Sequence, residues 1–141
     1  MSNPHLAQIH ALRQNARRFW AAWQAEEARL AQLGDIDFVE QASELLHQFC
    51  PDCIVELDGI APASGELPSL VFSANGIREH FPQVQALAEL AHSIGALLVV
   101  DNSLLSPVGS QPLKHGADIS VSSATKAIDG HGRVMGGVLS G

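Results

Sequence analysis

The sequence predicts a mixed α/β protein, in which an N-terminal α+β unit of two helices and two strands is joined to part of a doubly wound α/β domain. In the first half, apolar residues recur at the three- and four-residue steps of amphipathic helices. The second half contains ALLVVD at 96–101, an unbroken apolar run typical of parallel strands that are buried on both faces. A further strand-like segment, ADISVSS, follows at 117–123. At 141 residues the chain is long enough for one core.

A long first helix is predicted from residue 4 to about residue 33. Asn3 suits its N-cap, Pro4 its first helical position and Gly34 its end. The apolar stripe consists of Leu6, Ile9, Leu12, Ala16, Phe19, Trp20, Trp23, Leu30 and Leu33. The aromatic cluster within this stripe suits either a ligand platform or core packing, and core packing is the more frequent use.

A second helix is expected to begin at Asp37, whose carboxylate caps the first turn together with Glu40 three residues later. Pro51 ends it. Its expected buried stripe is Phe38, Val39, Ala42, Leu45, Leu46 and Phe49. Two short strands follow at 54–59 (IVELDG) and 69–74 (SLVFSA), and the loop between them is too long for a two-residue hairpin turn.

Cys50 and Cys53 lie in the segment FCPDC, between the second helix and the first strand. This spacing suits a redox disulfide or half of a zinc site. A thioredoxin-like pair begins a helix after a strand, whereas this pair ends a helix and leads into a strand. A closed zinc site needs four ligands. His47 is the one further candidate ligand near the two cysteines, and the chain has no second cysteine pair. Thiols in a turn, without a metal, are the favoured interpretation.

The net charge of −7 reflects 15 acidic and 8 basic residues, and the basic ones cluster only at Arg13, Arg17 and Arg18 of the first helix. A nucleic-acid partner needs a basic surface against its phosphates, so this class of partner is discounted. No apolar run reaches the roughly 18 residues of a membrane span, and the N-terminus lacks the apolar core of a signal peptide. We therefore expect no membrane partner and a cytoplasmic location.

The sequence pattern changes after Asn75 and Gly76. The elements expected there are a helix at 83–95, a strand at 96–101, a short helical turn at 111–116, a strand at 117–123 and a third short strand at 136–140. Gly95 separates the helix from the first of these strands, and Asp101 is that strand's last residue. Ligands of doubly wound sheets bind at the carboxyl ends of the strands, so Asp101 is placed where chemistry occurs.

Lys126 follows the strand at 117–123, in the segment SSATKAIDGHGR, and Lys114 is the only other lysine. A lysine after a strand is most often a solvated surface residue. A deprotonated amine can instead form a Schiff base with an aldehyde cofactor, and a carboxylate can pair with a protonated pyridine nitrogen. Ser123, Thr125 and the N–H groups of the turn suit a phosphate. Aldehyde, pyridinium and phosphate together are the functional groups of pyridoxal 5′-phosphate (PLP).

Four motifs follow one another in this half of the chain: VDN at 100–102, QPLKHGAD at 111–118, SATK at 123–126 and GHGR…GG at 130–137. In this order and spacing, residues from about 84 to 141 resemble the PLP-dependent enzymes of cysteine and methionine metabolism, the trans-sulfuration family. The resemblance implies a fragment of the large domain of a fold type I PLP-dependent transferase. The run IDGHGRVMGGV is most similar to the O-succinylhomoserine sulfhydrylases, which make homocysteine, while cystathionine γ-synthases and related lyases stay open.

By this resemblance, Lys126 matches the Schiff-base lysine and Asp101 matches the partner of the pyridine nitrogen. Ser123 and Thr125 match hydroxyl residues that bind the phosphate. The resemblance also implies that Lys126 acts as a base on the α-proton of the substrate. It further implies a small amino-acid substrate, an activated homoserine together with sulfide, and a homo-oligomer.

The chain departs from the family pattern beside the lysine, where Ser122 replaces a usual histidine and Ala127 a usual aromatic residue. The family's upstream phosphate loop, the tyrosine that stacks on the cofactor and the arginine that binds the substrate carboxylate have no match here. An incomplete pocket lacks the preorganised contacts of fast catalysis. A catalytically inactive, truncated remnant is therefore the alternative to an active enzyme.

Residues 1–83 resemble a small uncharacterised bacterial protein through LLHQFCPDCIVELDG and FSANGIREHFPQVQAL. The expected division is a small segment of unknown function at 1–83 and a partial PLP-dependent transferase domain at 84–141. We interpret the chain as a junction of two unrelated pieces, a fusion or truncated product. A partner-binding module in residues 1–83 is the other function kept open.

Overall fold

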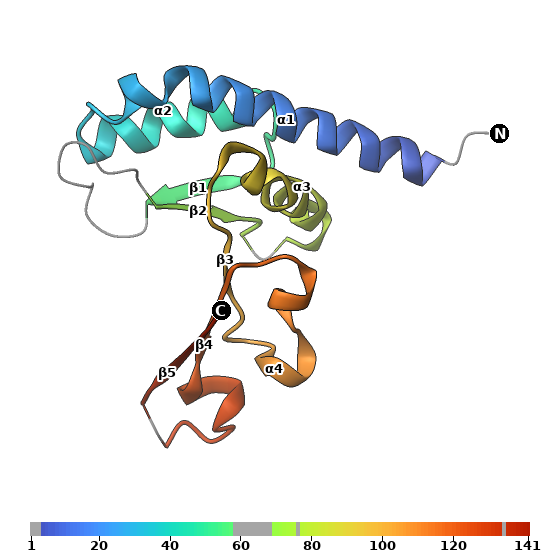
Figure 1. Cartoon of the computed structure of the whole chain (residues 1–141), viewed down its shortest axis with the longest axis vertical. Helices are drawn as coiled ribbons and strands as arrows, with labels where there is room; N and C mark the ends of the chain where they lie inside the picture. The colour runs from blue at the N-terminus through green and yellow to red at the C-terminus, as the bar shows by residue number, and fades with distance from the viewer. Residues whose placement is uncertain (1–3, 58–68, 76, 134) are drawn as a thin grey trace. The chain divides into compact units, whose positions relative to one another are not determined.

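The computed structural model describes residues 4–57, 69–75, 77–133 and 135–141 (Figure 1). The chain divides into two compact units, Met1–Leu90 and Ala91–Gly141. Both units mix helices with strands, in agreement with the α/β prediction. Among the described residues, no helix is both long enough and apolar enough to cross a membrane.

Unit 1 begins with two helices that lie side by side, α1 (Pro4–Leu30) and α2 (Asp35–His47) (Figure 1). The predicted start of α2 at Asp37 was wrong, because the helix begins two residues earlier. Gly34 is the N-cap, and its carbonyl accepts a hydrogen bond from Phe38 N at 2.8 Å. No side chain caps this end, so Asp37 is a residue of the first turn instead of its cap. The proposed N-cap of α1, Asn3, lies outside the described residues.

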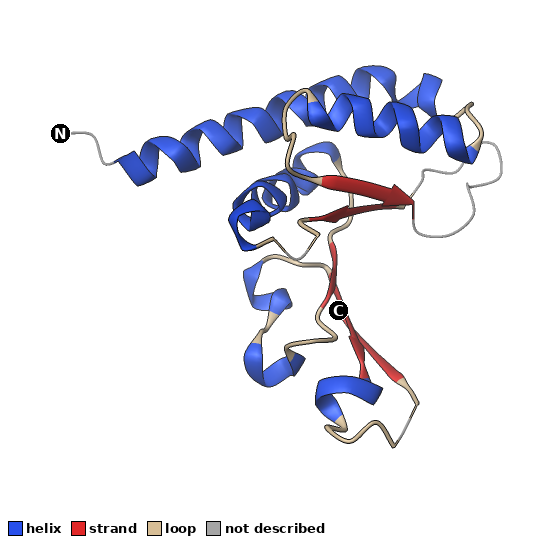
Figure 2. Ribbon diagram, turned by 180° about the vertical axis from the view of Figure 1, so that it is seen from behind, coloured by secondary structure: helices blue, strands red, loops and turns tan. Residues whose placement is uncertain are grey.

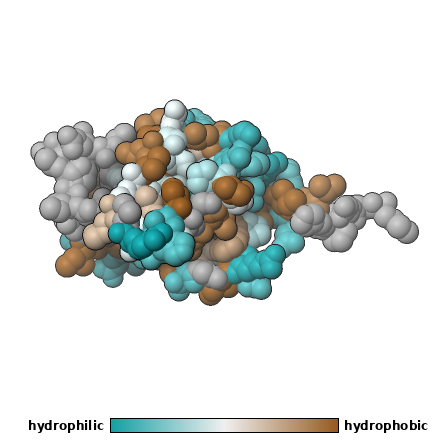
Figure 3. Space-filling model, turned by 90° about the horizontal axis from the view of Figure 1, so that it is seen from below, coloured by the Kyte–Doolittle hydropathy of each residue, from teal (hydrophilic) through white to brown (hydrophobic). Residues whose placement is uncertain are grey.

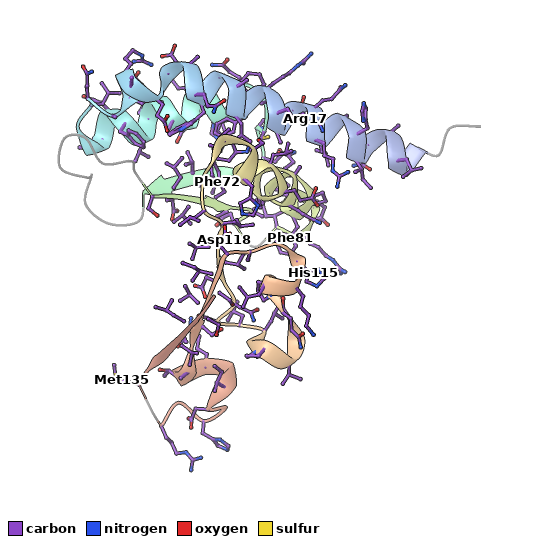
Figure 4. The ribbon with its side chains drawn as sticks, in the orientation of Figure 1. Arg17, Phe72, Phe81, His115, Asp118 and Met135 are labelled. Carbon is purple, nitrogen blue, oxygen red and sulfur yellow. The ribbon has the colours of Figure 1, made fainter. Side chains whose placement is uncertain are left out.

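The aromatic cluster of α1 forms the core of unit 1. Phe19 is only 1% exposed, and its ring lies 4.9 Å from that of Trp20 and 5.8 Å from that of Phe72. Phe72 comes from a strand and faces the helices (Figure 4). Trp23 packs edge-on against Phe38 of α2 at 5.9 Å. Because these rings contact one another and are buried, the cluster is packing and not an open ligand platform.

The strand pair of unit 1 consists of β1 (Ile54–Leu57) and β2 (Leu70–Ser73), which are antiparallel. The predicted loop between them, residues 60–68, lies outside the described residues, as do the last two positions predicted for the first strand. A short η1 (Arg78–His80) then leads into α3 (Phe81–Ala91). This helix packs within unit 1.

Two polar contacts and one buried side chain anchor α3 there. Leu87 is fully buried, and its carbonyl accepts a hydrogen bond from Trp20 Nε1 at 3.0 Å. Glu89 forms an ion pair of 2.8 Å with Arg13 of α1. The helix predicted at 83–95 is therefore present, although its last turn is the separate η2 (His92–Ile94), which ends at Gly95 with a positive φ of 77°.

Cys50 and Cys53 are free thiols and are almost completely buried. Burial, aided by the charge of Asp52, raises the pKa of Cys50 to about 11. Burial also raises the pKa of Cys53 to about 12. Since the thiolate is the reactive form, both residues are unreactive at neutral pH, which favours the structural interpretation of this pair.

Unit 2 contains a three-stranded sheet in the order β3–β4–β5, with short helical turns beside it (Figure 2). After η2, its elements are β3 (Val99–Asp101), α4 (Ser106–Gly109), η3 (Pro112–His115), β4 (Ile119–Ser123), the π-helical turn η4 (Ala124–Ile128) and β5 (Gly137–Ser140). The pair β3–β4 is parallel, as the α/β pattern predicted, and β4–β5 is antiparallel. The helix α4 was not expected from the sequence.

The prediction that 96–101 is a strand buried on both faces was wrong. Only Val99–Asp101 is a strand, with Val99 53% and Leu97 71% exposed. Among the described residues β3 pairs only with β4, so it is an edge strand, and an apolar strand is buried only where other elements cover both its faces. Figure 3 shows hydrophobic side chains, in brown, scattered among hydrophilic ones on the face that it draws.

Asp118 fixes the start of the parallel pair (Figure 4). Its carboxylate accepts hydrogen bonds from Leu98 N and His92 Nε2, both at 2.7 Å, while its own N–H donates to the Leu98 carbonyl at 2.9 Å. The bond from the Leu98 N–H lowers the pKa of Asp118 most, followed by the bond from His92, so Asp118 stays ionised. The aspartate of the QPLKHGAD motif therefore anchors β4 to the segment that leads into β3.

Candidate active site

Two of the predicted site residues end the two parallel strands. Asp101 is the last residue of β3, and Ser123 is the last residue of β4. Asp101 lies opposite Val121, two residues before Ser123, and alternate residues of a strand share a face. The structure therefore brings Asp101 and Ser123 to one face at the carboxyl edge of the parallel pair.

Ser103 connects these two strand ends. Its backbone N–H donates to Asp101 Oδ1 at 2.9 Å, and its hydroxyl forms a second hydrogen bond with the same carboxylate. The Ser103 Oγ in turn accepts the N–H of Ser123 at 2.8 Å. Ser103 is buried, whereas Asp101 is exposed at the end of β3. The Ser103 hydroxyl thus links the Asp101 carboxylate at the end of β3 to the backbone of Ser123 at the end of β4.

The hydrogen bonds from Ser103 also lower the pKa of Asp101. The hydroxyl of Ser103 lowers the pKa of Asp101 most, followed by the Ser103 N–H, and both outweigh the opposing effect of burial. The positive charge of Lys126 lowers this pKa by a smaller amount. Asp101 is therefore ionised at neutral pH, which is the state needed to pair with a protonated pyridine nitrogen.

Lys126 lies in η4, directly after β4, and its side chain is exposed. Its backbone (φ −93°, ψ −111°) interrupts the helical geometry of the turn. The Lys126 carbonyl accepts the N–H of Gly130 at 2.9 Å. Lys114, in contrast, lies in η3, and its charge is not among the causes that shift the pKa of Asp101. The structure thus brings Lys126 into electrostatic reach of Asp101.

Thr125 links the lysine turn to β5. Its Oγ1 accepts the N–H of Gly136 at 3.4 Å, and the Gly136 carbonyl accepts the N–H of Ala124 at 2.8 Å. The hydroxyl of Thr125 keeps its own hydrogen to donate. Of the two positions where the chain departs from the family pattern, Ser122 is buried and lies opposite Val138, while the Ala127 side chain lies outside those described.

Sequence reasoning missed Ser103. The available signal was the spacing of Asp101 and Ser103 within VDNS, since an aspartate often accepts the N–H two residues later in an Asx-turn. That pattern predicts the backbone contact, but it does not predict the contact with Ser123, which is 20 residues away in sequence.

The residues at this edge fit PLP chemically. Asp101 offers an ionised carboxylate, Lys126 a primary amine, and Ser123 and Thr125 two hydroxyls beside a turn rich in backbone N–H groups. Together with the parallel strand pair, this donor set points to the class of PLP-dependent α/β enzymes. A model of the family described as Cys/Met metabolism PLP-dependent enzyme matches residues 70–141, just over half of the chain. The chain belongs to this family, whose cofactor is PLP, and the resemblance predicted from the four motifs is confirmed.

Curated relatives match only part of the chain. The chloroplastic cystathionine beta-lyase of Arabidopsis thaliana is 48% identical over 86 residues, which are 60% of this chain and 18% of that protein. The O-succinylhomoserine sulfhydrylase of Pseudomonas aeruginosa is 60% identical over 58 residues, 41% of this chain and 14% of that protein. The O-acetyl-L-homoserine sulfhydrylase of Leptospira meyeri is 46% identical over 56 residues, which are 40% of this chain and 13% of that protein. The chain thus spans 13% to 18% of the length of these relatives. No solved structure matches it.

The contact between Ser103 and Asp101 gives a first prediction. Replacing Ser103 by alanine is expected to raise the pKa of Asp101 toward its ordinary value, because the hydroxyl is the largest cause of its lowering. An NMR titration of the Asp101 carboxyl measures this. A depressed folded-state pKa adds stability at pH values above the unfolded pKa, and this stability is lost as the pH falls through the folded pKa. The Ser103→Ala chain should therefore lose less stability on acidification.

Ser43→Ala, on α2 of unit 1, is the matched control and should leave the pKa of Asp101 unchanged. If the Asp101 titration were the same in the Ser103→Ala chain and in the wild type, Ser103 would not be the residue that holds this carboxylate.

Proposed function

We propose that unit 2 carries the cofactor residues of a PLP-dependent sulfur-amino-acid enzyme. Lys126 is the residue to which PLP attaches, and Asp101 is the partner of its ring nitrogen. Ser123 and Thr125 donate to its phosphate. The observation that carries this proposal is the position of Asp101, ionised at the carboxyl end of β3, within electrostatic reach of Lys126 after β4.

PLP, when bound, supplies an aldehyde for an amine and a ring that withdraws electrons from the substrate's α-carbon. The residues of this chain have separate tasks in that chemistry. Asp101, fixed by Ser103, orients the ring nitrogen and favours its protonated state. Lys126, at an exposed turn, takes up and returns the proton at the substrate's α-carbon.

The substrates we propose are an activated homoserine and sulfide, as in an O-succinylhomoserine sulfhydrylase of methionine biosynthesis. The support is the 60% identity to the Pseudomonas aeruginosa protein of that name over 58 residues. A lyase related to the cystathionine lyases is the second candidate, favoured by 48% identity over a longer stretch of 86 residues. A homo-oligomer is part of the proposal, as is a cytoplasmic location, which the free thiols of Cys50 and Cys53 fit.

The proposed architecture is a fragment of a fold type I PLP-dependent transferase large domain at 84–141, preceded by a segment of unknown function at 1–83. The proposed boundary lies between Leu70, where the family match begins, and Leu90, where unit 1 ends. Residues 70–83, which include β2, thus fall within the family match as well.

A reduction trap tests the proposal. The full chain is incubated with PLP, reduced with borohydride, and the modified lysines are mapped by mass spectrometry. We expect Lys126 to be labelled in preference to Lys114. Asp101→Asn should lower this preference about 10- to 100-fold, since a charged hydrogen bond contributes about 1.5–3 kcal/mol.

The control Asp37→Asn removes a carboxylate of α2 in unit 1 and should leave the labelling unchanged. Sparse labelling shared equally between Lys126 and Lys114 would count against the proposal. It would favour the alternative, a chain that keeps the family motifs without holding the cofactor.

A further inference from the structure

The loop that follows Lys126 closes on a single carboxylate. Asp129 Oδ2 accepts hydrogen bonds from two backbone N–H groups, that of Arg133 at 2.9 Å and that of His131 at 3.3 Å. His131 also contacts the same residue through its ring, since Nδ1 lies 3.1 Å from the Asp129 carbonyl oxygen. Asp129 therefore organises the whole segment from 129 to 133.

Two glycines make this convergence possible. Gly130 has φ 70° and Gly132 has φ 68°, a left-handed conformation that other residues adopt only at a cost. With glycine at alternate positions, the N–H groups of His131 and Arg133 point to the same side. Such concave groups of N–H donors bind anions. Here the anion is the chain's own Asp129 carboxylate.

Asp129 and Gly130 also bind the turn that contains Lys126, through their backbone N–H groups. The N–H of Asp129 donates to the Ala124 carbonyl at 2.9 Å, and the N–H of Gly130 donates to the Lys126 carbonyl at 2.9 Å. The backbone of Lys126 departs from helical geometry inside this turn, so its conformation depends on the bonds that enclose it. Asp129 is thus joined to Lys126 on one side and to the glycine loop on the other.

We propose that Asp129 is a positioning residue for Lys126. Its carboxylate holds the loop 129–133, and this loop holds the Lys126 backbone in the conformation from which the amine is presented to the cofactor. The inference rests on the proposed function, because it concerns the lysine to which PLP is assigned. Asp129 itself is assigned no contact with cofactor or substrate.

Two substitutions separate this role from a general loss of structure. Asp129→Asn keeps an oxygen that can accept both N–H groups, whereas Asp129→Ala removes the acceptor. Amide hydrogen exchange on the full chain is the first readout and needs no cofactor. His131 and Arg133 should be protected in the wild type and in Asp129→Asn, and unprotected in Asp129→Ala.

The second readout is the ratio of borohydride-trapped PLP on Lys126 to that on Lys114. Asp129→Ala should lower this ratio about tenfold, since small misplacements of a reacting group are costly, and Asp129→Asn should restore it. The control Asp37→Ala should change neither readout.

The outcomes distinguish the two proposals. If the wild type labels Lys126 selectively and Asp129→Ala, with its loop unprotected, labels it equally well, the positioning role is overturned while the proposed function stands. If the wild type shows no preference for Lys126, the proposed function fails, and the positioning role is overturned with it.

Discussion

Replacing Lys126 by alanine is expected to reduce the PLP that survives borohydride reduction from stoichiometric to background amounts. The covalent attachment needs a primary amine, and the chain offers only one other lysine side chain, Lys114. Lys114 lies in η3, and its charge does not contribute to the pKa of Asp101. We therefore expect no compensating increase of label on Lys114. Mass spectrometry of the reduced, intact chain measures the incorporation.

Lys126→Arg separates the covalent role of the side chain from its electrostatic one. Arginine keeps the positive charge that lowers the pKa of Asp101, but its guanidinium stays protonated and does not form the Schiff base. Trapped PLP should fall to background in this variant too, while the pKa of Asp101 stays lowered. Lys126→Ala should raise that pKa slightly, because Lys126 is a minor cause of its lowering.

Lys114→Ala is the matched control and should retain full incorporation at Lys126. If Lys126→Ala still trapped PLP stoichiometrically, the cofactor would be attached through another amine. The assignment of the SATK lysine as the cofactor residue would then be wrong for this chain.

The order of elements from α3 to β4 could be predicted because its signals are local. A helical pattern that ends at Gly95, an apolar run that ends at Asp101 and a second strand after Gly116 indicate successive α/β half-units, and β3 and β4 are indeed parallel. The register of that pair brings Asp101 and Ser123 to one edge, which is why their neighbourhood could be predicted from their positions after each strand.

Burial could not be predicted in the same way. The run ALLVVD resembles a doubly covered strand, yet Val99 is 53% exposed, because burial depends on which elements cover a strand and not on its own composition. The start of α2 was missed for a related reason. Gly34, expected to end α1, instead caps α2 through its carbonyl, and either use of a glycine fits the sequence.

The contact of Ser103 with Ser123 and the contacts of Asp129 with its loop could not be predicted from the sequence. Ser103 acts through the N–H of Ser123, and the pairing of β3 with β4 brings these residues together. Asp129 acts through N–H groups that converge only because Gly130 and Gly132 adopt positive φ. Sequence motifs identify the residues proposed to react or to bind the cofactor. The residues that position them are identified from contacts in the structure.

Phe19→Ala is expected to destabilise unit 1 by about 3–5 kcal/mol, the usual cost of removing a buried phenylalanine ring. The Phe19 side chain is 1% exposed, and its ring lies 4.9 Å from that of Trp20 and 6.1 Å from that of Trp23. It also packs edge-on against Phe72 of β2 at 5.8 Å. The lost ring would therefore leave a cavity between α1 and the strand pair. Domains have net stabilities of about 5–15 kcal/mol, so this cost is a large fraction of the total.

Urea unfolding, followed by the fluorescence of Trp20 and Trp23, measures this change, because both rings belong to the cluster. Leu6→Ala is the matched control on the same helix. Leu6 is 63% exposed, so its truncation should change the free energy of unfolding by no more than about 0.5 kcal/mol. A Phe19→Ala chain as stable as the Leu6→Ala chain would mean that the cluster does not support the core. The aromatic residues of α1 would then have to be considered again as a surface for a ligand or a partner, the use that their burial argues against.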